Sequence, residues 1–181
     1  AGAIYVVRDP RNVLTSLMNH YSLSEDGALK MINSIYRNLK DEQDNENYSS
    51  YSFISSWANN YNSWKKQKNI KILFIKYEDI ENDTDNTFSK ILNFTNKIIK
   101  KENIIKKDKF KRAIETTTFD VLKKKEANEG FNEAVYSKKD GKIKPFFYLG
   151  NQNNYKKLLK VKTTNSIEKL FYSEMKELKY L

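Results

Sequence analysis

Two short apolar runs, Ala3–Val7 and Ile70–Ile75, place the strongest constraint on the fold of this chain. Both are rich in β-branched and aromatic residues, and both are too short for a buried helix. Segments whose apolar residues recur at helical spacing lie between the two runs and after them. Strands that alternate with helices are typical of an α/β fold with a parallel sheet. We therefore predict a parallel sheet flanked by helices.

The spacing of apolar residues also predicts where the helices lie. Asp9 suits the N-cap and Pro10 the first turn of a helix that extends to about Tyr21. The other predicted helices are residues 25–38, 51–68, a segment that begins near residues 83–85, and the segments 110–116 and 166–178. Trp57 and Trp64 fall on the apolar face of the 51–68 segment, so both are expected in the core.

The length of 181 residues fits one domain, and neither an internal repeat nor a Pro/Gly linker divides the chain. We therefore expect a single domain over residues 1–181. Two polar stretches, 41–50 and 123–144, lack helical spacing and are predicted to be loops. A long loop inside a compact domain is commonly functional, so we expect residues 123–150 to form a mobile lid.

The net charge of +10 permits binding to polyanions, but the composition favours a dispersed charge. Only four of the 33 basic residues are arginine, and the chain is also rich in Asn and Ile. The absence of cysteine excludes a disulfide framework and a thiolate metal site, and one histidine leaves little for zinc. No metal is expected. No apolar run has the length of a membrane span and no signal peptide is visible, so we predict a cytoplasmic location.

Arg8 stands where the first predicted strand ends and the first predicted helix begins. In open α/β sheets this edge is where ligands bind, and a helix N-terminus favours an anion. The guanidinium adds a rigid donor fork suited to phosphate. Ser16 lies about two turns along the helix, on roughly the face of Asn12 and Val13. Arg8 and Ser16 together suggest a phosphate clamp, while the spacing alone also fits an ordinary capped helix.

The segment Ile4–Ser16 resembles the 3′-phosphate-binding motif of cytosolic-type sulfotransferases, which use 3′-phosphoadenylyl sulfate (PAPS) as donor. In that family a strand ends in Arg, and a Ser follows eight residues later. Arg8 and Ser16 fill both positions. The resemblance therefore implies that these two side chains hold the 3′-phosphate of the donor.

Two further segments resemble the family in the same order along the chain. Phe74–Asp79 is similar to the family strand that ends in Tyr-Glu-Asp, whose tyrosine lies beside the donor's adenine. This resemblance implicates Tyr77. The segment 117–119 is similar to the family's Thr-Ser-Phe, which also lies beside the adenine. It implicates Thr117, Thr118 and Phe119, whereas Phe119 would otherwise be interpreted as a core residue.

Residues 145–150 resemble the family's C-terminal loop, which closes over the donor, and implicate Tyr148, Leu149 and Gly150. Tyr148 and Leu149 stand where the family has Arg and Lys, and Tyr155 stands where it has Trp. Gly150 is retained. Two cationic contacts to the 3′-phosphate are thereby lost, which leaves backbone N–H groups near Gly150 to take their place.

The resemblance implies a P-loop-NTPase-like sheet that is incomplete at its N-terminus, because the chain corresponds to about the C-terminal two-thirds of a family domain. The phosphosulfate loop and the catalytic base are expected upstream. No catalytic residue is therefore assigned within this chain, and the activity of the chain alone stays open. His20 lies one turn beyond Ser16 and is interpreted as a helix C-terminal residue favoured by the helix dipole.

The implied function is transfer of a sulfuryl group from PAPS to a hydroxyl or amine of a small-molecule or glycan acceptor. Nucleic acid is not expected as a partner. Two alternatives stay open at this point: a basic domain that binds polyanions or RNA, and a P-loop nucleotide kinase relative. The sequence names neither the acceptor nor the oligomeric state.

Overall fold

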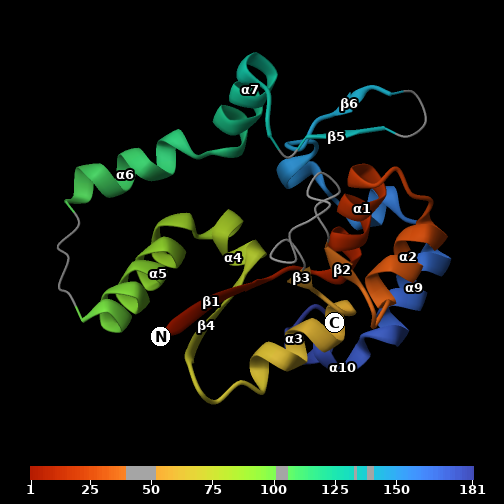
Figure 1. The fold of residues 1–181 in the computed structure, drawn as a ribbon, viewed down its shortest axis with the longest axis horizontal. Coiled ribbons are helices and arrows are strands. Elements are labelled where there is room, and N and C mark those ends of the chain that lie inside the picture. Colours follow the sequence, from red (N-terminus) through yellow and green to blue (C-terminus); the bar gives the residue numbers. More distant parts are fainter. Residues whose placement is uncertain (40–51, 101–105, 133, 138–140) are drawn as a thin grey trace, which may run out of the picture. The chain divides into compact units, whose positions relative to one another are not determined.

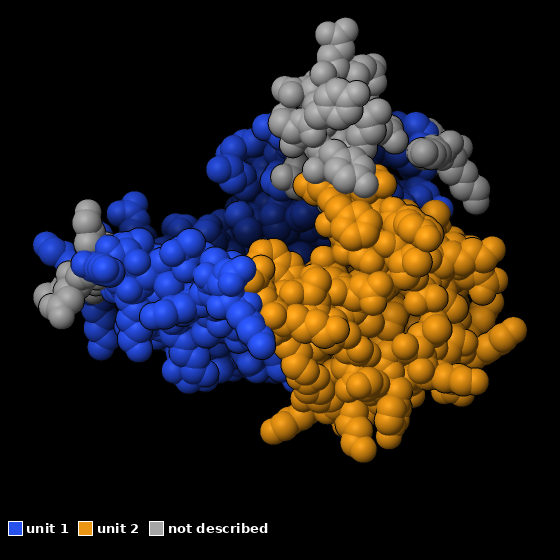
Figure 2. Space-filling view, turned by 60° about the horizontal axis from the view of Figure 1, so that its bottom comes forward, with its two compact units in different colours: residues 1–8, 20–22, 68–153 blue, residues 9–19, 23–67, 154–181 orange. Residues whose placement is uncertain are grey.

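The computed structural model of this chain describes residues 1–39, 52–100, 106–132, 134–137 and 141–181. The loop predicted at residues 41–50 lies outside them. The chain divides into two compact units, which Figure 2 distinguishes by colour. The first unit comprises residues 1–8, 20–22 and 68–153, and the second comprises residues 9–19, 23–67 and 154–181.

The first unit contains a parallel pair of strands (Figure 1). Strand β1 (Gly2–Val7) lies beside β4 (Lys71–Lys76), in a register that runs from Gly2 opposite Lys71 to Val7 opposite Lys76. Both strands lie within one residue of their predicted bounds. The predicted α/β fold with a parallel sheet flanked by helices is confirmed.

This sheet is less buried than the sequence predicted for its second strand. Ile75 is buried, but the side chain of Phe74 is 38% exposed, and Ile4 and Val6 of β1 are exposed as well. Helix α5 (Thr84–Ile99) packs against both strands. Gly2 allows this approach, because a Cβ atom there would lie 2.7 Å from the side chain of Ile98.

The first unit contains several further elements. They are α4 (Tyr77–Asn82), α6 (Lys107–Thr116), α7 (Phe119–Glu129), the antiparallel pair β5 (Val135–Tyr136) and β6 (Ile143–Lys144), and the 3-10 turn η2 (Gly150–Gln152). The loop predicted over 123–144 is therefore wrong for residues 123–129, which are helical. These residues are mostly Lys, Glu and Ala, which form helices well but leave no apolar periodicity when the helix is solvated.

The second unit is largely helical. Its elements are α1 (Pro10–His20), α2 (Glu25–Asn33), α3 (Trp57–Lys65), α8 (Tyr155–Leu158), α9 (Val161–Leu170), α10 (Tyr172–Glu177) and the antiparallel pair β2 (Asn38–Leu39) and β3 (Ser52–Phe53). Helix α2 packs against α9, and their contact buries Ala28, Ile32 and Ile167. Phe171 and Met175 complete this core.

The end of α2 and the start of α3 differ from the prediction by about five residues each. Helix α2 ends at Asn33 and not near residue 38, because Ser34 takes an extended backbone and the Arg37 carbonyl accepts hydrogen bonds from the N–H groups of Ile54 and Ser55. Helix α3 begins at Trp57 and not at residue 51, since the Ser56 hydroxyl caps it by accepting a hydrogen bond from the N–H of Asn59.

The two tryptophans of α3 differ in their surroundings. Trp57 packs against Phe171, with ring centres 5.3 Å apart, while the side chain of Trp64 is 37% exposed. The expectation that both lie in the core is thus wrong for Trp64. The helix predicted at 166–178 is divided at Phe171 into α9 and α10. Within the described ranges, no helix combines the length and the apolar character that a membrane span requires.

Candidate functional site

Arg8 and Tyr77 lie together because they follow the last paired residues of two parallel strands. Val7 pairs with Lys76, so the next residue of each strand emerges at the same edge of the sheet. The guanidinium carbon of Arg8 lies 4.0 Å from the centre of the Tyr77 ring, which is cation–π distance. The Nε atom of Arg8 is shielded from solvent. This stack fixes a cation at the edge of the sheet where ligands bind.

Glu81 belongs to the same cluster, and the sequence analysis missed it. It lies four residues after Tyr77 on α4, and it is exposed. Burial raises the pKa of Tyr77, the Glu81 charge raises it further, and Arg8 lowers it. The spacing of four residues on one helix is the sequence signal that could have placed Glu81 here.

Ser16 lies on α1 within the second unit and is exposed. Its hydroxyl donates a hydrogen bond to the Asn12 carbonyl at 3.1 Å, one turn earlier. This bond shows that Ser16 and Asn12 lie on one face of α1, as predicted. Arg8 belongs to the first unit, so the clamp formed jointly by Arg8 and Ser16 stays a prediction.

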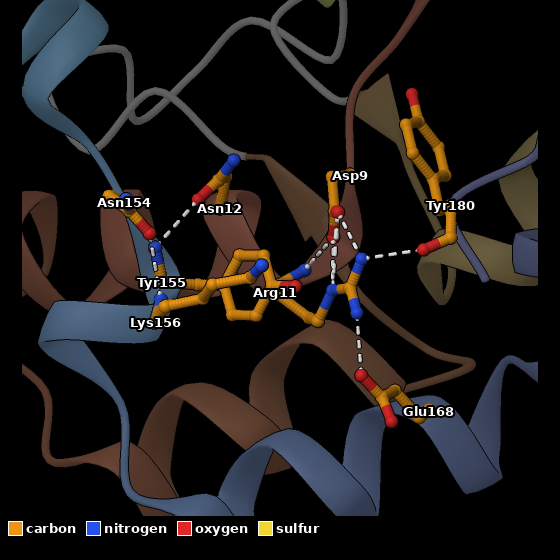
Figure 3. Close-up of polar contacts among 8 residues, drawn as sticks. All are labelled: Asp9, Arg11, Asn12, Asn154, Tyr155, Lys156, Glu168 and Tyr180. Atoms are coloured by element: carbon orange, nitrogen blue, oxygen red, sulfur yellow. Dashed lines mark hydrogen bonds and ion pairs between the residues drawn. The ribbon is translucent and has the colours of Figure 1, made fainter.

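Asp9 caps α1 as predicted, and it also anchors Arg11. Its carboxylate accepts hydrogen bonds from the Arg11 N–H at 2.9 Å and from the Arg11 guanidinium. The same guanidinium donates to Glu168 at 2.5 Å and to the Tyr180 carbonyl at 2.8 Å, as the dashed lines in Figure 3 mark. Arg11 and Asp9 are both buried. The guanidinium of Arg11, the second arginine of the segment Ile4–Ser16, therefore stabilises the packing of the second unit.

Tyr155, which the resemblance placed at the family's Trp position, lies against the same arginine. The guanidinium carbon of Arg11 is 4.1 Å from the centre of the Tyr155 ring. The N–H of Tyr155 donates a hydrogen bond to Oδ1 of Asn12 at 3.0 Å (Figure 3). The start of α8 is therefore fastened to the start of α1. This structural role of Arg11 was not predicted from the sequence.

Phe119 and Gly150 form a second cluster in the first unit. Phe119 begins α7, directly after Thr117 and Thr118, which are exposed. Gly150 has a left-handed backbone, and a Cβ atom there would lie 2.8 Å from three carbons of the Phe119 ring. Glycine is required at this position by both conditions. The structure thus brings together one residue of the predicted adenine-side segment and one residue of the predicted C-terminal loop.

Two side chains of α7 hold the segment that leads to Gly150. Glu126 accepts hydrogen bonds from the N–H groups of Phe146 at 2.6 Å and Phe147 at 2.9 Å. The ammonium of Lys123 donates to the Tyr148 carbonyl at 3.3 Å. Sequence reasoning missed both residues, because they fell in a stretch interpreted as loop. Leu149, next to Tyr148, is half-buried.

His20 lies in the first unit at the end of α1. Its ring is perpendicular to the ring of Tyr21 at 4.6 Å and to that of Phe146 at 6.2 Å. Its place in the last turn of α1 agrees with its interpretation as a helix C-terminal residue.

A family model for the sulfotransferase domain matches residues 2–179. The chain belongs to the sulfotransferase domain family. Among solved structures, this sulfotransferase domain is similar to the crystal structure of mouse sulfotransferase SULT7A1 complexed with PAP. The TM-score is 0.62 and the sequence identity 18%, and the match covers 95% of this chain but only 57% of the mouse chain.

The likeness to the mouse protein concerns the fold, and this sulfotransferase domain spans little more than half of that chain. Within the described residues, the contacts join Arg8 to Tyr77 and Phe119 to Gly150. The assignment of these residues, and of Ser16, to a donor nucleotide stays a prediction. The lid over residues 123–150 also stays a prediction, and residues 133 and 138–140 lie outside the described part.

Proposed function

We propose that this chain carries the nucleotide-binding part of a cytosolic-type sulfotransferase and holds the 3′-phosphate end of PAPS through Arg8. One observation carries the proposal. A guanidinium is stacked on Tyr77 at the carboxyl edge of a parallel sheet, in a chain of the sulfotransferase domain family. Such an edge, with a fixed cation beside a helix start, suits an anionic nucleotide.

Each candidate residue has a chemically defined task in this proposal. The Arg8 fork pairs with the phosphate oxygens, and the exposed hydroxyl of Ser16 adds a donor. Tyr77 holds the guanidinium from one side and thereby orients its plane. The threonine hydroxyls at 117 and 118 lie on the polar edge of the adenine.

The Phe119 ring is proposed to stack on the adenine, and Gly150 limits how it can do so. Because Gly150 lies against that ring, the adenine uses the remaining ring surface or displaces the loop. Tyr148 and Leu149 supply no cation, so the backbone N–H groups near Gly150 serve the phosphate in their place.

The proposed reaction moves a sulfuryl group from PAPS to a hydroxyl or amine. The bond from sulfur to the donor's phosphate oxygen breaks, a bond from sulfur to the acceptor oxygen or nitrogen forms, and the acceptor loses a proton. Adenosine 3′,5′-bisphosphate (PAP) leaves as the product. As in phosphoryl transfer, positioning and charge stabilisation supply most of the rate. Arg8 and Ser16 position the donor, and no residue of this chain is assigned as the base.

Calorimetric titration of the chain with PAP tests the proposal. The variant Arg8→Ala is expected to bind PAP tenfold or more weakly, which corresponds to the loss of about 1.5–3 kcal/mol for a hydrogen bond to a charged group. Arg112→Ala is the matched control, because Arg112 is an exposed arginine of the same unit. Its affinity for PAP is expected to equal that of the parent chain.

Adenosine 5′-phosphate, which has no 3′-phosphate, is the ligand control. The parent chain is expected to prefer PAP, and Arg8→Ala is expected to lose that preference. Equal PAP affinity in the parent chain and in Arg8→Ala would contradict the proposal. Salt-sensitive binding of generic oligonucleotides without a preference for PAP would favour a polyanion-binding domain instead.

A further inference from the structure

Helix α7 holds the segment 146–150 along one of its faces. Phe119, Lys123 and Glu126 are spaced by four and three residues, so their side chains share a face of this helix. Each of the three contacts the segment. The pairs, in their order along α7, are Phe119 with Gly150, Lys123 with the Tyr148 carbonyl, and Glu126 with the N–H groups of Phe147 and Phe146. The segment therefore runs antiparallel to the helix.

The ammonium of Lys123 is held at two points of this contact. Its nitrogen lies 3.3 Å from the Tyr148 carbonyl oxygen and 5.6 Å from the centre of the Phe119 ring, which is within cation–π range. An ammonium has three N–H donors, and the Tyr148 carbonyl accepts from one of them. The side chain is exposed, and within the described part of the chain no carboxylate forms an ion pair with it. Lys123 therefore offers further donors to a ligand beside Tyr148.

The segment that Lys123 contacts is where this chain lacks two cations. The resemblance to the family places Arg and Lys at positions 148 and 149, whereas this chain has Tyr148 and Leu149. Neither side chain carries a charge. Lys123 belongs to a different element, yet its ammonium ends at the backbone of Tyr148. A positive charge therefore reaches the same segment from another place in the sequence.

We propose that Lys123 binds the 3′-phosphate of the donor and supplies a cation that residues 148 and 149 lack. This inference rests on the function proposed above. Lysine is a compact charge on a flexible stem, so its ammonium can serve the Tyr148 carbonyl and a phosphate oxygen at the same time. Glu126 assists, because its two bonds to backbone N–H groups keep the segment on α7 and within reach of Lys123.

Calorimetric titration with PAP tests this role. Lys123→Ala and Lys123→Gln are each expected to bind PAP roughly fivefold to tenfold more weakly than the parent chain, because both remove a charged donor. The glutamine amide can still donate to the Tyr148 carbonyl, so Lys123→Gln separates the loss of charge from the loss of that bond. Lys123→Arg is expected to retain most of the affinity. Adenosine 5′-phosphate, which has no 3′-phosphate, is expected to bind the parent chain and the three variants equally.

Lys124→Ala is the matched control, since it removes the same charge from the next position of α7, where the side chain is also exposed. Its affinity for PAP is expected to equal that of the parent chain. An equal loss in Lys124→Ala and Lys123→Ala would show that the general surface charge attracts the ligand, and would overturn the inference. Unchanged PAP affinity in Lys123→Gln would overturn it as well.

Chemical acetylation of lysines in the parent chain, followed by mass spectrometry, provides a second measurement that needs no variant. Addition of PAP is expected to protect Lys123 from the reagent and to leave Lys124 reactive. Equal reactivity of Lys123 with and without PAP would overturn the inference.

The variant Arg8→Ala separates the two proposals. Unchanged PAP affinity in Arg8→Ala, or no PAP binding by the parent chain, overturns both. Weakened PAP affinity in Arg8→Ala together with unchanged affinity in Lys123→Gln overturns only the role of Lys123.

Discussion

Gly150 lies so close to Phe119 that a Cβ atom at position 150 would be 2.8 Å from three carbons of the ring. The backbone of Gly150 is also left-handed, with φ of 54°. Two separate physical demands therefore meet at one residue. The first is steric and depends on the ring, whereas the second is local and depends on the backbone alone.

The substitution Gly150→Ala is expected to destabilise the first unit more than Gly141→Ala. Gly141 has a left-handed backbone too, with φ of 67°, but a Cβ atom there would meet no neighbour within 4 Å among the described residues. Both variants incur the left-handed penalty of about 1–2 kcal/mol, while Gly150→Ala adds an overpacking cost of about 1–3 kcal/mol. Urea unfolding measures the difference. Equal effects of the two variants would show that the Phe119 contact is not maintained.

Arg11→Ala is expected to reduce the free energy of unfolding by about 3–5 kcal/mol, since it leaves the buried carboxylate of Asp9 without its partner. Arg11→Lys is expected to recover only part of this loss. An ammonium cannot reach Asp9, Glu168 and the Tyr180 carbonyl at once in the manner of the planar guanidinium. Chemical denaturation of the three proteins provides the measurement.

Lys65→Ala is the control for this prediction. Lys65 forms an ion pair with Glu177 at 2.6 Å, but both side chains are more than two-fifths exposed. Solvent screens such a pair, so its loss is expected to cost about 1 kcal/mol or less. A cost for Lys65→Ala as large as that for Arg11→Ala would show that burial does not set the difference.

Tyr5 is expected to make the fold sensitive to alkali. Burial raises the pKa of Tyr5 to about 12, and its ring packs against Phe74 on the sheet. The unfolded chain ionises tyrosine near pH 10, so the folded chain binds more protons between about pH 10 and pH 12. The stability contributed by neutral Tyr5 is therefore complete below about pH 10 and decreases as the pH rises through the folded value.

Urea unfolding at about pH 9 and pH 11 tests this sign. The variant Tyr5→Phe is expected to lose less stability between the two pH values than the parent chain. Tyr136→Phe, which alters a tyrosine that is 68% exposed, is expected to match the parent chain. A steeper loss in Tyr5→Phe than in the parent chain would contradict the assignment.

Glu126→Ala is expected to release the segment before Gly150. The carboxylate accepts two backbone hydrogen bonds, from Phe146 and Phe147, and a bond to a charged group contributes about 1.5–3 kcal/mol when shielded. Phe146 is partly exposed, so we expect the contribution of these bonds to be at the low end of this range. Amide hydrogen exchange at the two residues is then expected to accelerate by roughly tenfold in Glu126→Ala.

Glu129→Ala serves as the comparison for Glu126→Ala. It removes an exposed carboxylate of the same helix, which forms an ion pair with Lys125 at 3.8 Å. Exchange at Phe146 and Phe147 is expected to be unchanged in this variant. Acceleration of the same size in both variants would mean that loss of helix α7, and not loss of the two hydrogen bonds, frees the segment.

Local sequence patterns were sufficient to predict those elements that do not depend on contacts with distant parts of the chain. The runs at 3–7 and 70–75 predicted β1 and β4, and Asp9 with Pro10 predicted the start of α1. Helix α7 was missed because a solvated helix of Lys, Glu and Ala has no apolar stripe. The end of α2 was missed because hydrogen bonds from Ile54 and Ser55, distant in sequence, hold the backbone at Arg37 out of a helix.

The sequence by itself determined the parallel sheet, the place of Arg8 at a strand end and the membership of residues 2–179 in a family. Only the tertiary structure decided what each side chain contacts. Strand register placed Arg8 on Tyr77, and the approach of α9 to the start of α1 assigned Arg11 to Glu168 and not to a ligand. Strand and helix patterns arise from neighbouring residues, whereas the charge balance of a site arises from groups that only folding brings together.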